Sequence, residues 1–251
     1  AARMKEKHKA KIFQSIQDKY KVAEVGYLNA LLMAIDKKDG EATRAFIDKI
    51  ENLNQTEDSG ISPLLAAVAK KHTKLASYLV DKGADPFLFI EKHNHSPFSK
   101  AVAEELSPFI EYLFPRFKEK IAAYCNDEQL SLSPQFLAYK NPKIFDLLLG
   151  AGAKPHWGGR EGKAPLVKAV EKASLAMLPV LVKNKIDLNQ TVEGKTLLEW
   201  AILFNRPEWV SGLLDEMVDL TIPTSEGGTF IDLAQKLEGR EDILQLLMEE
   251  E

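Results

Sequence analysis

Apolar residues along this chain fall into short amphipathic stretches that come in pairs. In residues 60–86, one apolar segment of helix length is followed by a polar break, a second apolar segment and an exit that contains glycine. Residues three and four positions apart share a helix face, and the second segment shows this spacing at Leu75, Leu79 and Val80. The pattern predicts two short helices joined by a turn.

This pattern recurs along the chain with a period near 33 residues. Relative to Pro63, the corresponding residues are Ala30, Pro63, Pro97, Pro134, Pro165, Leu197 and Phe230, at successive spacings of 33, 34, 37, 31, 32 and 33. An alanine stands four positions later each time: Ala34, Ala67, Ala101, Ala138, Ala169, Ala201 and Ala234. A fixed period with a small residue at one position is the signature of a repeat architecture.

Signals for helix starts and ends occupy constant places within the repeat. A hydroxyl residue, which can cap free N–H groups, precedes the reference position in five repeats: Ser62, Ser96, Ser133, Thr196 and Thr229. Proline at the reference position suits the first helical turn, where its missing N–H costs no hydrogen bond. Gly83 and Gly152, each followed by proline three residues later, mark the ends of second helices.

Residues 62–67 (SPLLAA), the exit Gly83-Ala84-Asp85-Pro86 and the period together resemble the ankyrin repeat family. The resemblance covers residues 26–251, although the family's TPLH histidine is absent from every copy. It implies an all-α solenoid of about seven helix–turn–helix repeats with short hairpin fingers. The repeats are expected to start near residues 27, 60, 94, 131, 162, 194 and 227. Tetratricopeptide repeats have a similar period, but their bulky aromatic pattern is missing here.

Two segments depart from the regular repeat. Residues 5–24 predict a basic helix with Ile12, Phe13, Ile16 and Tyr20 on one stripe. We interpret residues 1–26 as an N-terminal basic capping helix laid on the first repeat. A membrane-surface helix is the alternative, and the thin apolar stripe disfavours it.

The third repeat is expected to be irregular. Its second apolar run is stopped by Pro115, and residues 116–130 have a helical pattern where a turn is expected. Because proline ends or kinks a helix, we expect a distorted repeat near residues 108–133.

Composition and charge narrow the functional classes. The 251 residues are 45% hydrophobic, with no apolar run long enough to cross a bilayer and one cysteine, Cys125, which suits a reducing compartment. Residues 1–26 carry seven Lys/Arg against three acids (+4), whereas residues 193–251 carry four against fourteen (−10). This asymmetry indicates polar end caps or electrostatic steering of a partner. The acidic half disfavours nucleic acid as a ligand.

Fragments that imitate catalytic motifs have simpler explanations. Residues 162–164 and 194–196 resemble the end of a phosphate-binding loop, but Trp157 and Asn189 replace its first glycine. His93 and His95 lack the further ligands of a zinc site. Cys125 has no neighbouring histidine in the sequence and is expected to be a buried thiol. We therefore expect no enzyme, no cofactor and no metal.

The ankyrin resemblance implies that binding uses the fingertips and the ends of the first helices. The candidate partner-binding residues are Asp58, Ser59, Ile61, Lys70, Lys92, His93, His95, Glu104, Trp157, Arg160, Lys163, Lys172, Leu203 and Phe204. Phe204 stands out in a column that is otherwise polar. It is either a binding anchor or a packing residue against the seventh repeat. Trp200 and Trp209 occupy expected core positions.

The sequence thus predicts a protein–protein interaction module, or adaptor, that binds a protein partner through its concave face and fingertips. We expect a monomeric, cytoplasmic protein that binds neither nucleic acid nor membrane. The alternative is a domain that recruits substrates or host targets for a larger protein, such as a secreted bacterial effector, located in the host cytosol. A catalyst within residues 105–133 would require an activity lost in Cys125→Ser while folding is retained.

Overall fold

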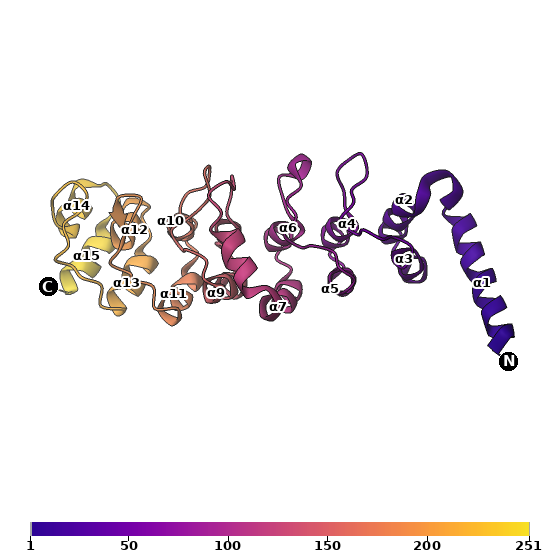
Figure 1. The fold of residues 1–251 in the computed structure, drawn as a ribbon. Coiled ribbons are helices and arrows are strands. Elements are labelled where there is room, and N and C mark those ends of the chain that lie inside the picture. Colours follow the sequence, from indigo (N-terminus) through magenta and orange to yellow (C-terminus); the bar gives the residue numbers. More distant parts are fainter. Residues whose placement is uncertain (1, 251) are drawn as a thin grey trace. The chain divides into compact units, whose positions relative to one another are not determined.

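The computed structural model describes residues 2–250, which fall into two compact units that divide between residues 113 and 114 (Figure 1). The described secondary structure is helical apart from one two-stranded hairpin. Seven successive helix pairs follow the N-terminal helix, at the period expected from the sequence. The predicted all-α repeat fold is confirmed.

Unit 1 consists of a row of first helices with second helices packed against them. Helices α2, α4 and α6 pack side by side, and α3 and α5 pack against α2 and α4. The elements are α1 (Ala2–Lys19), α2 (Val22–Asp36), α3 (Gly40–Ile47), α4 (Pro63–Ala69), α5 (Thr73–Asp81), η1 (Glu91–His93), α6 (Pro97–Ala103) and the start of α7 (Ser107–Cys125).

Unit 2 repeats this arrangement with α8, α10, α12 and α14 as the row of first helices. After the rest of α7, its elements are α8 (Pro134–Leu137), α9 (Pro142–Ala151), α10 (Pro165–Glu171), η2 (Leu175–Met177), α11 (Leu178–Lys183), β1 (Thr191–Val192), β2 (Lys195–Thr196), α12 (Leu197–Leu203), α13 (Pro207–Asp215), α14 (Phe230–Lys236) and α15 (Glu241–Glu249). Strands β1 and β2 pair antiparallel, with Thr191 opposite Thr196.

Side-chain caps fix where the first helices begin. The hydroxyl oxygens of Ser62, Ser133 and Thr196 accept hydrogen bonds from the amide three residues later, at 3.2, 3.1 and 3.2 Å. Such a cap contributes about 1 kcal/mol of stability. The hydroxyl residues found in the sequence therefore cap five of the seven first helices, α4, α6, α8, α12 and α14.

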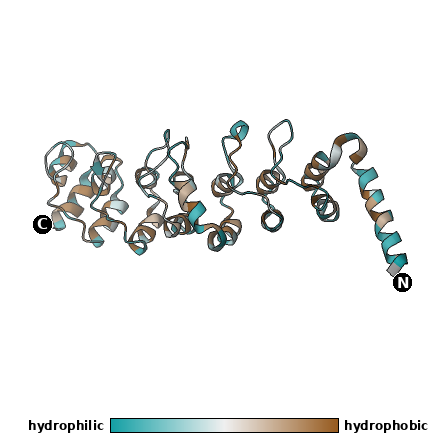
Figure 2. Cartoon of the chain, in the orientation of Figure 1, coloured by the Kyte–Doolittle hydropathy of each residue, from teal (hydrophilic) through white to brown (hydrophobic). Residues whose placement is uncertain are grey.

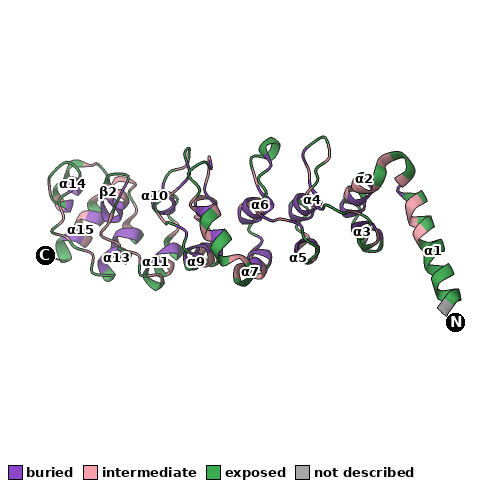
Figure 3. Cartoon of the chain, viewed as in Figure 1, coloured by how far each residue is buried: buried purple, intermediate pink, exposed green. Residues whose placement is uncertain are grey.

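The alanine column allows neighbouring first helices to approach closely. All seven alanines are at most 2% exposed, and Figure 3 shows buried faces where helices within each unit meet. Figure 2 shows hydrophobic residues on these inner faces and polar residues in the loops. A larger side chain at these positions would force the helices apart.

The turns between paired helices use left-handed backbone conformations. Lys38, Lys71, Glu105 and Asn205 have φ angles of 58°, 58°, 59° and 54° at this position. Gly83 and Gly152, with φ of 101° and 110°, end α5 and α9. The predicted helix ends are confirmed. Glycine suits these positions because it lacks the Cβ atom that makes a positive φ unfavourable.

Helix α1 ends at Lys19, whereas the sequence predicted a helix over residues 5–24. Lys21 adopts a left-handed conformation, and Gly26 interrupts α2 with a non-helical φ/ψ pair. Residues 3–12 of α1 are exposed (Figure 3), whereas Tyr20 is fully buried and donates a 2.8 Å hydrogen bond to Asp39 Oδ2. The contact with the first repeat is therefore concentrated at the C-terminal end of α1.

The third repeat is irregular, as predicted, but Pro115 does not end its second helix. Helix α7 continues to Cys125 with a kink at Phe117, where φ is −133° and ψ is 27°. A proline inside a helix removes one backbone hydrogen bond and bends the axis. The continued helix buries Cys125 completely, which confirms the expected burial of this thiol.

Two arginines tie successive repeats of unit 2 together. Arg206 Nη2 donates to the Glu171 carbonyl oxygen at 2.6 Å, at the C-terminal end of α10. Arg240, 34 residues later, donates from Nε to the Ile202 carbonyl (2.8 Å) and from Nη2 to the Leu203 carbonyl (2.9 Å) at the end of α12. Each arginine therefore donates to carbonyl groups in the last turn of the preceding first helix, including the Glu171 and Leu203 carbonyls.

Candidate functional site

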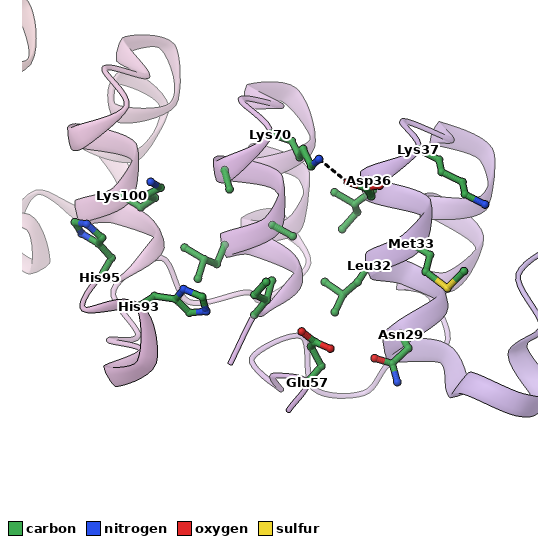
Figure 4. Close-up of a pocket in the computed structure, with 15 residues that line it drawn as sticks. Asn29, Leu32, Met33, Asp36, Lys37, Glu57, Lys70, His93, His95 and Lys100 are labelled. Atoms are coloured by element: carbon green, nitrogen blue, oxygen red, sulfur yellow. Dashed lines mark ion pairs between the residues drawn. The ribbon is translucent and has the colours of Figure 1, made fainter. Parts of the chain in front are cut away.

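A groove of about 700 Å³ lies over the first helices of unit 1. Helix α2, helix α4 and the finger that precedes α6 supply its walls. In Figure 4, Asn29, Leu32 and Met33 approach from α2, and His93 and His95 approach from the opposite side. The cap at Ser62 and the buried alanines set the position of α4 beneath it.

The floor of this groove is apolar and partly exposed. Leu32, Ile61 and Ala66 are half-buried, and Met33 is 38% exposed. Ala66 and Ala69 keep the floor low because their side chains end at Cβ. Methionine is flexible and polarisable, so it adapts to partner side chains of different shape.

Charged groups form the rim of the groove. Lys70 Nζ lies 2.5 Å from Asp36 Oδ1, and this hydrogen bond is the main cause of the lowered pKa of Asp36. On the other side, Lys100 and Lys71 contact the two Glu104 carboxylate oxygens at 2.8 and 3.2 Å. Their hydrogen bonds lower the pKa of Glu104. The rim therefore presents charges already held in defined positions.

The fingers of the second and third repeats are joined to each other. Lys92 Nζ donates to the Asp58 carbonyl oxygen, and His93 Nε2 lies 3.1 Å from the Ser59 carbonyl oxygen. His95 Nδ1 lies 3.1 Å from Ser99 Oγ, and burial is the main cause of the lowered pKa of His95. These contacts hold the finger side of the groove in place.

In unit 2, four half-buried aromatic residues lie on or just after α8 and α12, and three lysines, one from α10 and two from the fingers, lie over their rings. We call Phe136, Tyr139, Trp200 and Phe204 the aromatic row. Lys168 Nζ lies 5.9 Å from the ring centroids of both Phe136 and Tyr139. Lys163 Nζ lies 5.9 Å from the Phe204 centroid, and Lys195 Nζ lies 5.8 Å from that of Trp200.

The predicted binding residues gather at more than one place. Ile61, Lys70, His93 and His95 line the groove of unit 1, whereas Asp58, Ser59 and Lys92 lie at the contact between fingers. Glu104 lies beside the groove, bound to Lys100.

The predicted residues of unit 2 are more scattered. Lys163 contacts the Phe204 ring, and the Leu203 carbonyl is bonded to Arg240. Arg160 and Lys172 are exposed, and Trp157 is half-buried. The Trp157 indole Nε1 is buried and has no hydrogen-bond partner among the described residues.

Sequence reasoning missed residues that lie one helical turn before the predicted helix ends. Ala66 and Lys100 line the groove at this position, and Lys168 and Trp200 belong to the aromatic surface of unit 2. The groove residue Met33 has the same register in the first repeat, where no helix end was predicted. Residues four apart share a helix face, so this spacing was a signal for them.

The expected core position of Trp200 was wrong. Its ring is half-exposed, and its Nε1 donates to the Val192 carbonyl at 2.8 Å. Trp209 is buried, as expected.

Other kinds of site find little support in the part of the chain that the structure describes. Residues 2–250 contain no group of three or more His, Cys, Asp or Glu side chains placed to hold a metal ion. None of the described helices has the length and hydrophobicity needed to span a membrane. Burial raises the pKa of the Cys125 thiol, which disfavours its nucleophilic thiolate form.

Comparisons with known proteins agree with the repeat geometry. Residues 135–224 match a family model described as ankyrin repeats (3 copies), and residues 59–89 match one described as ankyrin repeat. A Borreliella burgdorferi protein named as an ankyrin repeat protein is 28% identical over 120 residues, which are 45% of this chain and 52% of that protein. The match therefore spans about half the length of this relative.

Two solved structures show the same fold. The ankyrin repeat domain of Bcl-3, described as a unique member of the IkappaB protein family, matches with a TM-score of 0.70 and 20% identity, covering 87% of this chain and 97% of that one. The human ASB11 ankyrin repeat domain matches with a TM-score of 0.66 and 19% identity, covering 88% and 97%. The family models and the Borreliella burgdorferi relative thus identify ankyrin repeats in the chain, at residues 59–89 and 135–224. Ankyrin repeats are in general protein–protein interaction modules with a non-catalytic scaffold fold.

Proposed function

We propose that this chain binds a protein partner through the groove over α2, α4 and α6. The observation that carries the proposal is a preformed hollow with an apolar floor and a charged rim. An apolar centre surrounded by polar groups is the usual anatomy of a protein interface. Because its finger side is fixed by Lys92 and His93, binding requires little ordering of the groove.

The aromatic row is the proposed second contact surface. Aromatic side chains are enriched in protein interfaces, and tryptophan and tyrosine are common among the residues that dominate binding energy. Phe204 and Trp200 are half-buried on α12, and Lys163 and Lys195 lie over their rings. A partner side chain can pack on this surface without first breaking a buried contact of the core.

The test compares partner capture by the wild-type chain and by Ala66→Glu/Ala69→Glu. Both alanines line the groove floor, and alanine and glutamate are both good helix formers. Captured proteins are identified by quantitative mass spectrometry and titrated directly against each variant. We expect the groove variant to lose the partner while its circular dichroism spectrum and melting temperature stay at wild-type values.

The matched control is Ala123→Glu/Ala176→Glu, which adds the same charge at two exposed alanines outside the groove. It is expected to bind as the wild type does. Equal binding by the groove variant and the wild type would place the contact elsewhere and overturn the proposal.

A further inference from the structure

A second hollow, of about 460 Å³, lies in unit 1 between the second helices α3 and α5 and differs in character from the groove. It is lined by cations and polar groups together with a few apolar side chains. Its lining residues are Ile35, Lys38, Gly40, Thr43, Arg44, His72, Lys74, Leu75 and Tyr78. No carboxylate is among these described lining residues.

Three cations of this hollow are unpaired. Lys38, Arg44 and Lys74 are exposed, and none of them makes an ion pair with any residue from 2 to 250. Three like charges around one hollow repel each other, which is unfavourable unless an anion is present.

Nearby acids are engaged by other lysines. Asp36 is paired with Lys70, Asp48 with Lys82, and Asp39 with Lys19. The exception is Glu41, which follows Gly40, makes no ion pair among residues 2–250 and does not line the hollow, so three cations at the hollow stand against one unpaired acid beside it.

A buried polar atom at this site also lacks a partner. His72 Nε2 is buried without a hydrogen-bond partner among the described residues, although unpaired buried nitrogens are rare in proteins. His72 is the N-cap residue of α5, and its side chain makes no capping hydrogen bond. The start of α5 therefore keeps amide groups without a side-chain cap, and a helix N-terminus favours anions. His72 and the next-but-one residue, Lys74, both line the hollow.

We propose that the hollow between α3 and α5 binds a phosphoryl group carried by a small phosphate ester or by a lipid headgroup. Arg44 supplies a planar fork suited to two phosphate oxygens, and Lys38 and Lys74 supply point charges. His72, whose buried Nε2 has no hydrogen-bond partner among the described residues, lines the same hollow. Ile35 lines both this hollow and the proposed protein-binding groove, but Lys38, Arg44, His72 and Lys74 line only this one, so the proposal does not rest on the proposed function.

The experiment is calorimetric titration of the whole chain with pyrophosphate, for the wild type and for Arg44→Gln/Lys74→Gln. We expect saturable binding by the wild type, weakening as salt is added. The double variant should bind at least about tenfold more weakly, since each lost contact is a charge-assisted hydrogen bond. Both substituted residues are exposed, and equal melting temperatures would show that folding is retained.

The control Lys118→Gln/Lys120→Gln removes the same charge at two exposed lysines of α7 and is expected to bind as the wild type does.

Parallel sedimentation with phosphatidylcholine vesicles, with and without phosphatidylinositol 4-phosphate, distinguishes the two sources of phosphate. Binding to pyrophosphate without binding to the phosphoinositide vesicles identifies a soluble phosphate compound, and binding to the phosphoinositide vesicles alone identifies a lipid headgroup. Absence of both, or equal weakening in the control, would overturn the proposal.

Discussion

The rings of Trp200 and Phe204 stack nearly parallel at the C-terminal end of α12, with centroids 5.3 Å apart and planes 14° from parallel. The two residues are one helical turn apart, so both rings project from the same face of the helix. Lysines from two different fingers lie over them. The sequence singled out Phe204 alone, whereas the structure shows that its ring pairs with that of Trp200.

Removing one ring of this pair should lower the stability of the fold as well as remove part of the proposed contact surface. We expect Phe204→Ala to lower the free energy of unfolding by about 0.5–1.5 kcal/mol from the lost ring contact. Urea unfolding measures this change, and the fluorescence of Trp200 should report the loss of its neighbour. Phe204→Tyr keeps the ring and should be close to wild type. If Phe204→Tyr is destabilised as much as Phe204→Ala, the stack is not what stabilises this face.

The arginine contacts between repeats should be worth more than an ordinary surface contact. Arg240→Ala leaves the Ile202 and Leu203 carbonyls without their cationic donor. Hydrogen bonds to charged groups contribute about 1.5–3 kcal/mol, so we expect a loss in this range by chemical denaturation. Arg240→Lys should recover only part of it, since lysine lacks the planar fork. Exposed Arg160→Ala is the control, and an equal loss there would contradict this account.

The carboxylate of Asp39 should make stability fall at acid pH. Hydrogen bonds from Lys19, the Ala42 amide and Tyr20 lower the pKa of Asp39 to about 2 from the usual 3.8. A carboxyl group with a lowered folded-state pKa stabilises the fold above its unfolded pKa, and this contribution disappears as pH falls. We expect a loss of about 1 kcal/mol between about pH 4 and pH 2, allowing for solvent screening.

The measurement is the unfolding free energy of the wild type and of Asp39→Asn over this pH range. The variant should be less stable at neutral pH and should lose less stability than the wild type on acidification. Parallel pH curves for the two proteins would show that another carboxylate is responsible.

Cys125 should be unreactive while the protein is folded. The thiol is fully buried, and burial raises its pKa, so the reactive thiolate is scarce and inaccessible. A thiol-specific chromogenic reagent should label it only as the chain unfolds, at the rate followed by circular dichroism. Rapid labelling under native conditions would show that α7 opens without unfolding of the whole unit.

The sequence predicted the repeat, its helices and their starts because these depend on local chemistry. A hydroxyl cap, a first-turn proline and a buried alanine act within one repeat, so Ser62, Pro63 and Ala67 could be interpreted from their own neighbours. The face that each first helix presents depends on how it lies beside the next repeat. For this reason Lys70 was found and Ala66, four residues earlier, was not.

Contacts between repeats also could not be predicted from the sequence. At the position of the family's histidine stands Glu199, which is 3% exposed and accepts hydrogen bonds from the Ser225 amide at 3.1 and 3.0 Å. A different residue type thus makes a bond to the following finger. The bond joins residues 26 apart through backbone geometry, which no local pattern encodes.

The two arginine contacts bear on how such a chain can lengthen over evolutionary time. Arg206 and Arg240 stand 34 residues apart and each binds carbonyl groups of the preceding repeat. The arginine thus belongs to the following repeat, and the atoms that accept its hydrogen bonds are main-chain carbonyl oxygens, which every first helix has. A gene duplication that copies one of these repeats would copy its attachment with it, without matching changes in the neighbour.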